Sequence, residues 1–321
     1  MTPTLKMACW DYDRTRPLVD GRVTVPEFGL DITLMRPREA FRRMLEREEF
    51  DIAEVSLANY ARLKAEGDNR FVAIPVALSK MFRHSCMYVR AGSGIDVPAD
   101  LIGRRVGVSQ IDSTGILFIK GMLQHEYGVA PSQMNWIVGG LEASMAAPKR
   151  LPQNHGTIEC LPEGRTLMEE FAVGRLDAIL SNHMPSNFKA GSSDIHRLFK
   201  KFRTVEQDYY GRTGIFPVMH VVALRSDIHQ RHPFLAKALY DAFSRARDIA
   251  VEGLYDTDAL RLALPWLIDH LEEATAILGI DFWSYGLKPN YAAWHAICRY
   301  QVEQGITSHA LQPEELFVPV E

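Results

Sequence analysis

Two ionisable residues, Arg83 and His84, interrupt an apolar stretch at positions 81–89, and His220 stands inside a second apolar stretch at 216–224. Removing such groups from water costs free energy unless a hydrogen-bond or ion-pair partner compensates it. Buried ionisable groups are therefore often found at functional sites. Histidine exchanges protons near neutral pH, and the guanidinium of arginine matches the geometry of a carboxylate. The pattern predicts acid–base chemistry on an anionic ligand. The alternative is that the histidines are hydrogen-bonded core residues.

Polar residues follow four of the segments that have strand patterns. They are Tyr12, Asp13, Arg14, Thr15, Arg16, Glu54, Ser56, Asn59, Ser109, Gln110, Asp112, Ser113, Thr114, Ser181, Asn182 and His183. In open α/β sheets, ligands bind beyond the carboxyl ends of the strands. Ser113 or Thr114 would cap a helix whose free N–H groups attract an anion. We expect these residues to converge on one ligand site; the alternative for any single Ser or Thr is a helix cap and nothing more.

A third polar group, Asp208 to Arg212, precedes the second apolar stretch. Tyr209 and Arg212 are expected to reach the same site. The alternative for the tyrosines in this group is a packed aromatic corner.

Several common catalytic centres are excluded by motifs that the chain lacks. There is no His-Glu-x-x-His, no Gly-x-x-x-x-Gly-Lys phosphate loop and no Gly-x-Ser-x-Gly elbow. The four cysteines (Cys9, Cys86, Cys160, Cys298) lie far apart without a Cys-x-x-Cys pair, which indicates buried thiols in a reducing compartment and no structural zinc.

Composition narrows the class of protein further. The 321 residues include 36 Lys plus Arg against 40 Asp plus Glu, a formal net charge of −4, with no block of like charge, so nucleic-acid binding is not expected. Apolar runs fall far short of the roughly 18 residues that span a bilayer, and no apolar leader precedes the first expected strand. These features predict a cytoplasmic protein that does not insert into a membrane.

Strand and helix patterns alternate twice along the chain and would position the polar residues. In the first part, strands are expected at 5–10, 29–34 and 51–56, with a helix opened by Pro37. Strands at 105–109, 135–139 and 176–180 follow, with a helix at 115–127 and another capped by Thr166 and Glu169. Short connections of this kind imply parallel pairing and an α/β layer.

The extended stretches at 82–89 and 215–224 would carry the chain out of the first lobe and back. The predicted first lobe therefore comprises residues 1–90 plus 214–321, with C-terminal helices, and the second comprises 91–213. Each lobe is expected to be a mainly parallel sheet flanked by helices, with a ligand cleft at the hinge. The aromatic C-terminal helices are interpreted as core or as an interface between copies in a homo-oligomer.

Five strings together resemble one enzyme family over nearly the whole chain. They are YDRTRPLVDG, FDIAEVSLANYARLKAEGDNRFVAIPV, MFRHSCMYVR, VEQDYYGRTGIFPVMHVVALR and HPFLAKALYDAF. The family is that of the 4,5-dihydroxyphthalate decarboxylases, whose members resemble type II periplasmic binding proteins in fold. The resemblance implies a carboxy-lyase of aromatic catabolism (phthalate degradation) that converts 4,5-dihydroxyphthalate to protocatechuate with no organic cofactor. The sequence shows no metal-ligand pattern; the alternative is a divalent metal that bridges the two neighbouring hydroxyls of the substrate.

The chemistry that the resemblance implies needs three kinds of group: cations for two carboxylates, an acceptor for a phenol proton, and an acid aimed at a ring carbon. Deprotonating the hydroxyl para to a carboxylate pushes electron density onto the carbon that bears it. Protonation of that carbon and loss of carbon dioxide then restore the aromatic ring.

The residues expected in these roles come from the apolar stretches and the polar loops. His84 is the first choice of proton donor and His183 the next, and Glu54 accepts from a phenol. Substrate-binding residues are Arg14, Arg83, Ser109, Thr114, Tyr209, Arg212 and His220. The alternative function is a solute-binding protein that captures an aromatic or small carboxylate without changing it.

Overall fold

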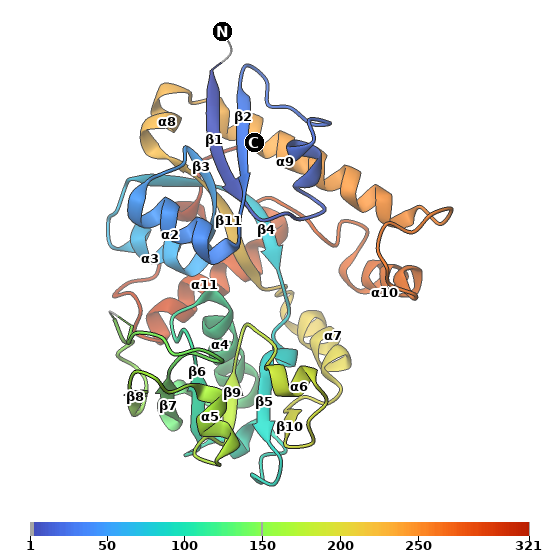
Figure 1. The fold of residues 1–321 in the computed structure, drawn as a ribbon. Helices are drawn as coiled ribbons and strands as arrows, with labels where there is room; N and C mark the ends of the chain where they lie inside the picture. Colours follow the sequence, from blue (N-terminus) through green and yellow to red (C-terminus); the bar gives the residue numbers. More distant parts are fainter. Residues whose placement is uncertain (1–2, 149, 321) are drawn as a thin grey trace. The chain divides into compact units, whose positions relative to one another are not determined.

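The computed structural model describes residues 3–148 and 150–320, whose contacts divide the chain into two compact units (Figure 1). The first unit is Met1–Lys80, Val218–Trp294 and Gln312–Glu321, and the second is Met81–Pro217 and His295–Leu311. The division lies ten residues before the predicted boundary at 90 and a few residues after the one at 213. Residues 295–311, expected in the first lobe, group with the second unit, where the Gln304 side chain donates to the Leu117 carbonyl (2.9 Å).

The first unit is built on a five-stranded sheet of order β2-β1-β3-β11-β4. Its strands are β1 (Thr4–Cys9), β2 (Gly29–Leu34), β3 (Ile52–Ser56), β4 (Phe71–Lys80) and β11 (Val218–Arg225). β1 pairs in parallel with β2 and β3, whereas β11 lies antiparallel between β3 and β4. The sheet is therefore mixed, because β11 begins beside Lys80, at the point where β4 leaves the sheet. The three strands expected before residue 60 are confirmed to within one residue.

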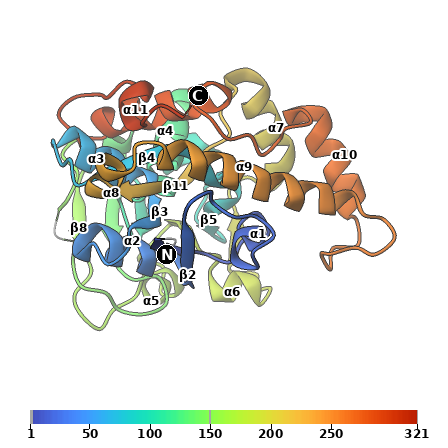
Figure 2. The same cartoon turned by 90° about the horizontal axis from the view of Figure 1, so that it is seen from above.

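The structure describes α-helices between and after the strands of the first unit. They are α1 (Arg16–Val19), α2 (Pro37–Arg47), α3 (Leu57–Ala65), α8 (Ser226–Arg231), α9 (Leu235–Glu252) and α10 (Leu267–Leu278). Pro37 opens α2 as expected, and Ala40, Met44 and Leu45 form its buried face, which packs against β3. The C-terminal part of α9 and all of α10 extend beyond the sheet (Figures 1 and 2). Trp266, before α10, is 71% exposed.

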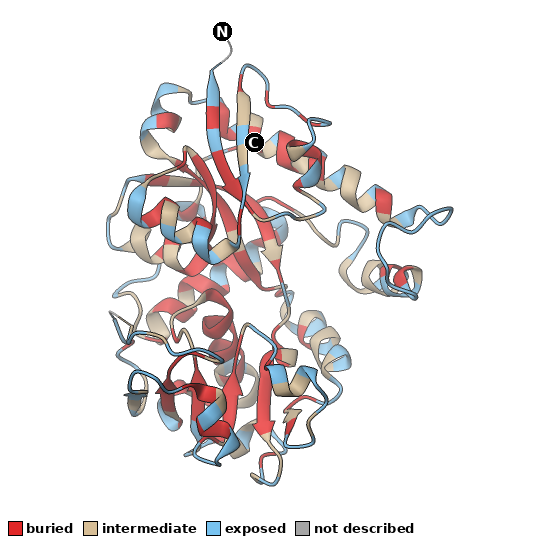
Figure 3. Ribbon diagram, in the orientation of Figure 1, coloured by how far each residue is buried: buried red, intermediate tan, exposed pale blue. Residues whose placement is uncertain are grey.

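The second unit is built on a six-stranded sheet of order β10-β5-β9-β6-β7-β8. Its strands are β5 (Met87–Arg90), β6 (Arg105–Val108), β7 (Asn135–Val138), β8 (Ile158–Cys160), β9 (Ala178–Leu180) and β10 (Ile195–Arg197). The β9-β6-β7-β8 part is parallel, as expected, and β5 and β10 are antiparallel additions at one edge. Buried residues concentrate on the strands of both sheets (Figure 3).

The helices of the second unit are α4 (Thr114–Tyr127), α5 (Leu167–Ala172), α6 (Ser186–Lys189), α7 (Phe202–Thr213) and the part of α11 (Tyr291–Glu303) from His295 on. Short 3₁₀ turns occur at η1 (His84–Cys86), η2 (Pro98–Leu101), η3 (Pro131–Gln133), η4 (Gly253–Tyr255), η5 (Lys288–Asn290) and η6 (Pro313–Leu316). Among the described residues, no helix is long and apolar enough to cross a membrane.

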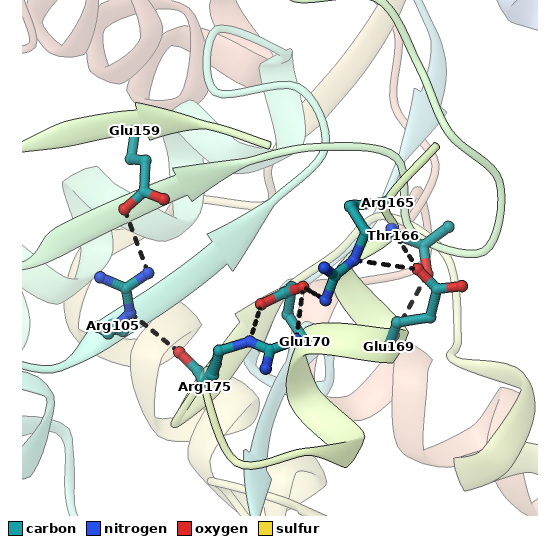
Figure 4. Close-up of polar contacts among 7 residues, drawn as sticks. All are labelled: Arg105, Glu159, Arg165, Thr166, Glu169, Glu170 and Arg175. Carbon is teal, nitrogen blue, oxygen red and sulfur yellow. Dashed lines mark hydrogen bonds and ion pairs between the residues drawn. The ribbon is translucent and has the colours of Figure 1, made fainter. Parts of the chain in front are cut away.

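The capping box predicted for α5 is confirmed. Thr166 Oγ1 accepts from the Glu169 N–H (3.2 Å), and Glu169 Oε2 accepts from the Thr166 N–H (2.8 Å), as Figure 4 shows. Glu170, the next residue, is paired with both Arg165 and Arg175. The capping bonds satisfy backbone donors at the start of α5.

One segment differs from the expected extended conformation. The chain turns at Arg83, whose carbonyl accepts from the Cys86 N–H (3.0 Å), so His84 lies in η1 and the strand begins only at Met87. The apolar composition of 81–89 reflects burial, and it contains no glycine or proline that would have indicated a turn.

Candidate active site

Glu54, in β3, is the centre of a polar cluster in the first unit that we call the Glu54 cluster (Tyr12, Glu54, His220). Its Oε1 accepts a hydrogen bond from the Tyr12 hydroxyl (2.6 Å) and pairs with Nδ1 of His220 (2.6 Å). Its Oε2 accepts from the Trp10 N–H (2.9 Å). Glu54 is 0% exposed, so the carboxylate is held entirely by protein donors.

The sheet order explains why these residues meet. In the antiparallel β3–β11 pair, Glu54 stands opposite Val222 and His220 stands opposite Ser56. Glu54 and His220 are therefore diagonal neighbours on one face of the sheet. Tyr12 reaches them from the loop that follows β1, the strand beside β3.

Hydrogen bonding decides the charge of Glu54. Burial acts to raise the pKa of Glu54, but the hydrogen bond and charge of His220, together with the bonds from Tyr12 and Trp10, outweigh it and bring the pKa below its ordinary value. Burial and then the charge of Glu54 raise the pKa of the Tyr12 hydroxyl well above its usual range. At neutral pH the cluster therefore holds a carboxylate, a neutral phenol and an imidazole.

The imidazole of His220 is the member of the cluster that reaches toward solvent. Its side chain is 20% exposed, and its ring packs edge-on against Phe41, with the centroids 4.8 Å apart. Because Glu54 engages Nδ1, it fixes the ring orientation and favours a proton at Nδ1. This leaves Nε2 as the nitrogen that can exchange a proton with a ligand.

Arg14 lies beside the Glu54 cluster and is sandwiched between two aromatic rings. Its guanidinium carbon is 3.9 Å from the ring centroid of Tyr12 and 4.5 Å from that of Trp283. Nε donates to the Leu78 carbonyl (2.7 Å) and Nη1 to Asp13 (3.0 Å). Of its five N–H groups, two donate to described residues, so a planar cation remains with donors for a carboxylate.

In the second unit, the loops after β6 and β9 meet at the N-terminus of α4. The side-chain amide of Asn182 donates to Ser113 Oγ (3.0 Å), and Oδ1 of Asn182 is buried without a partner among the described residues. A Cβ placed on Gly115 would overlap Asn182 Oδ1 and lie 3.1 Å from the guanidinium carbon of Arg83. Thr114, the first residue of α4, is 4% exposed. We call this group the Asn182 cluster (Arg83, Ser113, Thr114, Gly115, Asn182).

His84 lies apart from these donors, in an aromatic part of the second unit. It is 0% exposed, and the rings of Tyr127, Phe199 and Tyr209 approach it edge-on. Nδ1 lies 3.8 Å from Glu206 Oε1, and neither ring nitrogen hydrogen-bonds within residues 3–148 and 150–320. Burial, with the charge of Arg212 in addition, lowers the pKa of His84 to about 4.

Three further predicted residues lie on or near the surface of the second unit. Arg212, on α7, is 57% exposed and pairs with Glu126. His183, three residues beyond the end of β9, is exposed, and Ser109, directly after β6, is half-buried. The predicted residues thus fall into groups: Glu54 and His220 beside Arg14, Arg83 with Thr114, and His84 with Tyr209.

Lys80 and Glu206 are ionisable residues that were not singled out from the sequence. Lys80 ends β4 and is 6% exposed, and Glu206 lies on α7 beside His84. Burial raises the pKa of Glu206 to about 7. The only signal for Lys80 was its position after a long apolar strand. Among residues 3–148 and 150–320, no three His, Cys, Asp or Glu side chains gather as a metal site would require.

Comparison with known proteins gives two relatives by sequence. A protein of Comamonas testosteroni named 4,5-dihydroxyphthalate decarboxylase is 36% identical over 321 residues, which cover 98% of this chain and 96% of that protein. A Pseudomonas putida protein of the same name is 34% identical over 209 residues, 64% of this chain and 81% of that one.

Structural comparison gives the fold. The periplasmic aliphatic sulphonate binding protein of Escherichia coli matches with a TM-score of 0.56 at 11% identity, covering 99% of this chain and 98% of that one. A family model described as an ABC transporter phosphonate periplasmic substrate-binding protein matches residues 27–147. These likenesses confirm the expected α/β fold of the periplasmic-binding-protein type.

Proposed function

The chain belongs to the 4,5-dihydroxyphthalate decarboxylase family, and we propose that it removes carbon dioxide from a hydroxylated aromatic carboxylic acid, namely 4,5-dihydroxyphthalate, to give protocatechuate. The observation that carries the proposal is the 36% sequence identity, over 98% of this chain, with the Comamonas protein of that name. The Glu54 cluster supports it, because a buried carboxylate paired with a partly exposed imidazole is an arrangement suited to proton transfer.

The ring of such a substrate supplies its own electron sink. Loss of the proton from the hydroxyl para to the departing carboxylate raises electron density at the carbon that bears that carboxylate. That carbon takes a proton, the bond to the carboxylate breaks, and its electron pair restores the aromatic ring. The net reaction consumes one proton and releases one carbon dioxide molecule.

We assign the proton donor for the ring carbon to His220, with Glu54 as the residue that orients it. A protonated imidazole delivers its Nε2 proton while the Glu54 carboxylate stabilises the positive charge at Nδ1. Tyr12, which donates to the same carboxylate oxygen, keeps that oxygen in place. The imidazole is then reprotonated from solvent for the next turnover.

Carboxylate binding in the first unit is assigned to Arg14, because its stacked guanidinium presents a planar fork of donors. Arg83 and Thr114 are proposed as a second anion-binding group, supported by the α4 N-terminus and the unpaired oxygen of Asn182. Ser109, Tyr209 and Arg212 stay predictions as substrate-binding residues.

His84 and His183 stay predictions as proton donors, and both rank below His220. His84 is enclosed by three aromatic rings, and its pKa, lowered by burial to about 4, leaves it without a proton to spare at neutral pH. His183 is exposed, and its bond to Ser181 Oγ (3.1 Å) holds the backbone N–H, not the ring. His220 is favoured because Glu54 fixes its ring.

The reaction is proposed to take place in the cytoplasm. All four cysteines are free thiols, and Cys9, Cys86 and Cys298 are buried, which agrees with a reducing compartment. Fractionation of the native host followed by an activity assay on each fraction tests this location.

The test of the function is turnover of 4,5-dihydroxyphthalate by the purified full-length chain after treatment with a chelator. Release of protocatechuate and carbon dioxide in equal amounts is the expected result. Activity that returns only when a divalent metal is restored would keep the reaction but remove the cofactor-independent part of the proposal.

The second candidate function is capture of an aromatic or small carboxylate without chemistry. It is favoured by the substrate-binding-protein family model over residues 27–147. Tight binding of intact 4,5-dihydroxyphthalate without turnover, with or without metal, would support it and overturn the decarboxylase proposal.

A further inference from the structure

Lys80 is a charged residue that the proposed mechanism does not use. It is 6% exposed at the end of β4, and its Nζ donates to Ser284 Oγ (3.4 Å). Its charge interacts with those of Asp281, Arg247 and Arg14. A lysine at the end of a strand can usually extend its ammonium group into water. Lys80 is instead folded into the protein, where its charged form is costly unless an anion lies close to it.

The segment 281–286, which covers Lys80, is held firmly in place. The Gly286 N–H donates to the Pro75 carbonyl (2.7 Å). The Asn290 side chain donates to the carbonyls of Ser284 and Gly286, both at 3.1 Å. These bonds connect the segment that contains Ser284 to β4 and to η5.

Two further cations act on Lys80 and are themselves mostly buried. Arg14 and Arg247 have side chains that are 13% and 14% exposed. Their acidic partners, Asp13, Asp248 and Asp281, are 47%, 49% and 58% exposed. Water screens the exposed carboxylates more than the buried guanidinium groups. The positive charge of the two arginines therefore dominates in the protein interior near Lys80.

The hydroxyl of Tyr285 is a second, independent observation at the same place. Tyr285 is 2% exposed, and its oxygen is buried without a hydrogen-bond partner among the described residues. The guanidinium of Arg247 lies 5.0 Å from the ring centroid, and the charges of Arg14 and Arg247 both act on the phenol. A buried hydroxyl without a partner costs free energy, and an oxygen of a bound anion would satisfy it.

We propose that Lys80, Arg14 and Tyr285 form a carboxylate subsite in the first unit, and that this subsite holds the carboxylate that the aromatic substrate keeps through the reaction. The assignment to the retained carboxylate rests on the proposed function. The departing carboxylate becomes neutral carbon dioxide, so cations around it would stabilise the ground state and raise the barrier. The retained carboxylate keeps its charge, so cations around it bind substrate without opposing the reaction.

The subsite makes Lys80 a specificity-determining residue for aromatic diacids. A substrate with one carboxylate can place it either in the subsite or at the reacting position, whereas an ortho-diacid fills both. The product, protocatechuate, retains the carboxylate held by Lys80, so product and substrate share this contact.

The experiment compares Lys80→Met, Lys80→Arg and, as a matched control, Lys237→Met, whose lysine is 58% exposed on α9. Lys80→Met is expected to raise the KM for 4,5-dihydroxyphthalate and the inhibition constant of protocatechuate by the same factor, about tenfold or more, with kcat within about threefold. Lys80→Arg restores most of the affinity, and Lys237→Met changes neither constant.

Calorimetric binding of phthalate, a diacid without the hydroxyls needed for the chemistry, separates this inference from the proposed function. A weaker phthalate affinity in Lys80→Met, restored in Lys80→Arg, supports the subsite even if the protein turns over no substrate. An unchanged phthalate affinity overturns it. A fall in kcat with an unchanged protocatechuate inhibition constant also overturns it, because Lys80 would then act on the departing carboxylate or as an acid.

A pH series adds a signature that a structural role for Lys80 would not give. Burial, opposed by the charge of Asp281 and reinforced by the charges of Arg247 and Arg14, lowers the pKa of Lys80 to about 7. Phthalate affinity should therefore weaken in the wild type as the pH rises through this value, and the weakening should be absent from Lys80→Arg. A parallel weakening in both proteins would contradict the subsite.

Discussion

Glu54 and His220 are joined by a 2.6 Å contact between Oε1 and Nδ1, with the carboxylate fully buried and the imidazole side chain one-fifth exposed. The two residues are 166 positions apart in the sequence, and they meet because β11 returns to lie beside β3. This pair defines the centre of the candidate active site. The activity should therefore depend on the carboxylate of Glu54.

Replacing Glu54 with Gln should lower kcat by about 10²–10⁴-fold while the protein stays folded. The glutamine side chain keeps the shape of the original, but it cannot stabilise a positive imidazole. Its amide group also has to present N–H bonds where Glu54 accepts from Tyr12, His220 or the Trp10 N–H. Steady-state kinetics with a thermal melt as the folding control measures this. An activity close to that of the wild type would remove the Glu54 cluster from the mechanism.

The two main histidine candidates are separated by a pair of variants. His220→Asn should lower kcat by about 10²–10⁴-fold with the KM within about threefold, as expected for loss of a general acid. His84→Phe, which suits the surrounding aromatic rings, should lower kcat less than about tenfold. The reverse result, with the large loss at His84 and a small one at His220, would restore His84 as the proton donor.

Arg14→Lys should raise the KM for the diacid by about tenfold or more, although the charge is kept. Lysine cannot stack as a plane between Tyr12 and Trp283, and it offers no fork to a carboxylate. Arg22→Lys is the matched control, because Arg22 is 45% exposed and pairs only with its neighbour Asp20 in the contacts described. Equal behaviour of the two variants would argue against a binding role for Arg14.

Gly115→Ala tests the Asn182 cluster. The added methyl would overlap Asn182 Oδ1, so Asn182 and the nearby Arg83 guanidinium must move. The variant should stay folded and bind phthalate about tenfold more weakly, or worse, if the α4 N-terminus holds an anion. Gly211→Ala on α7, where a Cβ meets nothing within 4 Å, is the control. Unchanged phthalate binding in Gly115→Ala would count against an anion site there.

Glu206→Gln should change stability in a pH-dependent way. The pKa of Glu206 rises from 4.5 to about 7 through burial, so the folded state binds more protons than the unfolded state between these values. The stability that Glu206 contributes below pH 4.5 is thus lost as the pH rises through 7. Glu206→Gln should match the wild type near pH 4.5 and exceed it by about 1–3 kcal/mol at pH 8.

Urea denaturation at several pH values measures this difference. His84, whose pKa is lowered to about 4, makes stability fall as the pH drops from 6.5 toward 4, and it does so in both proteins. Above about pH 6.5, His84 is neutral in the folded and the unfolded state, so the difference between the two curves from there to about pH 8 reports Glu206. Curves that stay parallel from pH 4.5 to about pH 8 would show that Glu206 does not titrate as described.

The sequence predicted the framework well because the signals for it are local. The strand pattern at 29–34 and Pro37 at the start of α2 each act over a few residues, and both elements form where expected. The Thr166 and Glu169 capping box is likewise encoded within four positions. The polar residues after the strands were also recognised from local signals, because they stand directly after the predicted strands in the sequence.

The grouping of the site residues was not predictable from local pattern. Arg14, Glu54 and His220 come together only through the order of strands in the first sheet. His84 was placed on a strand because its neighbours are apolar, whereas its surroundings come from α4, α7 and the segment before α7. Lys80 escaped notice because a lysine that ends an apolar strand has the same sequence pattern whether it extends into water or folds inward.

The late return of β11 has a consequence for synthesis on the ribosome. β11 fills the middle of the first sheet, yet residues 81–217 must be made between β4 and β11. At about 5–20 residues per second this takes roughly 7–27 s. During that interval β3 and β4 lack the neighbour that lies between them, and their unpaired edges and apolar faces are open to other chains. The second unit also lacks the hydrogen bond from Gln304 to the Leu117 carbonyl until Gln304 has been made. Nascent chains of this protein should therefore depend on chaperones until almost the whole chain has emerged.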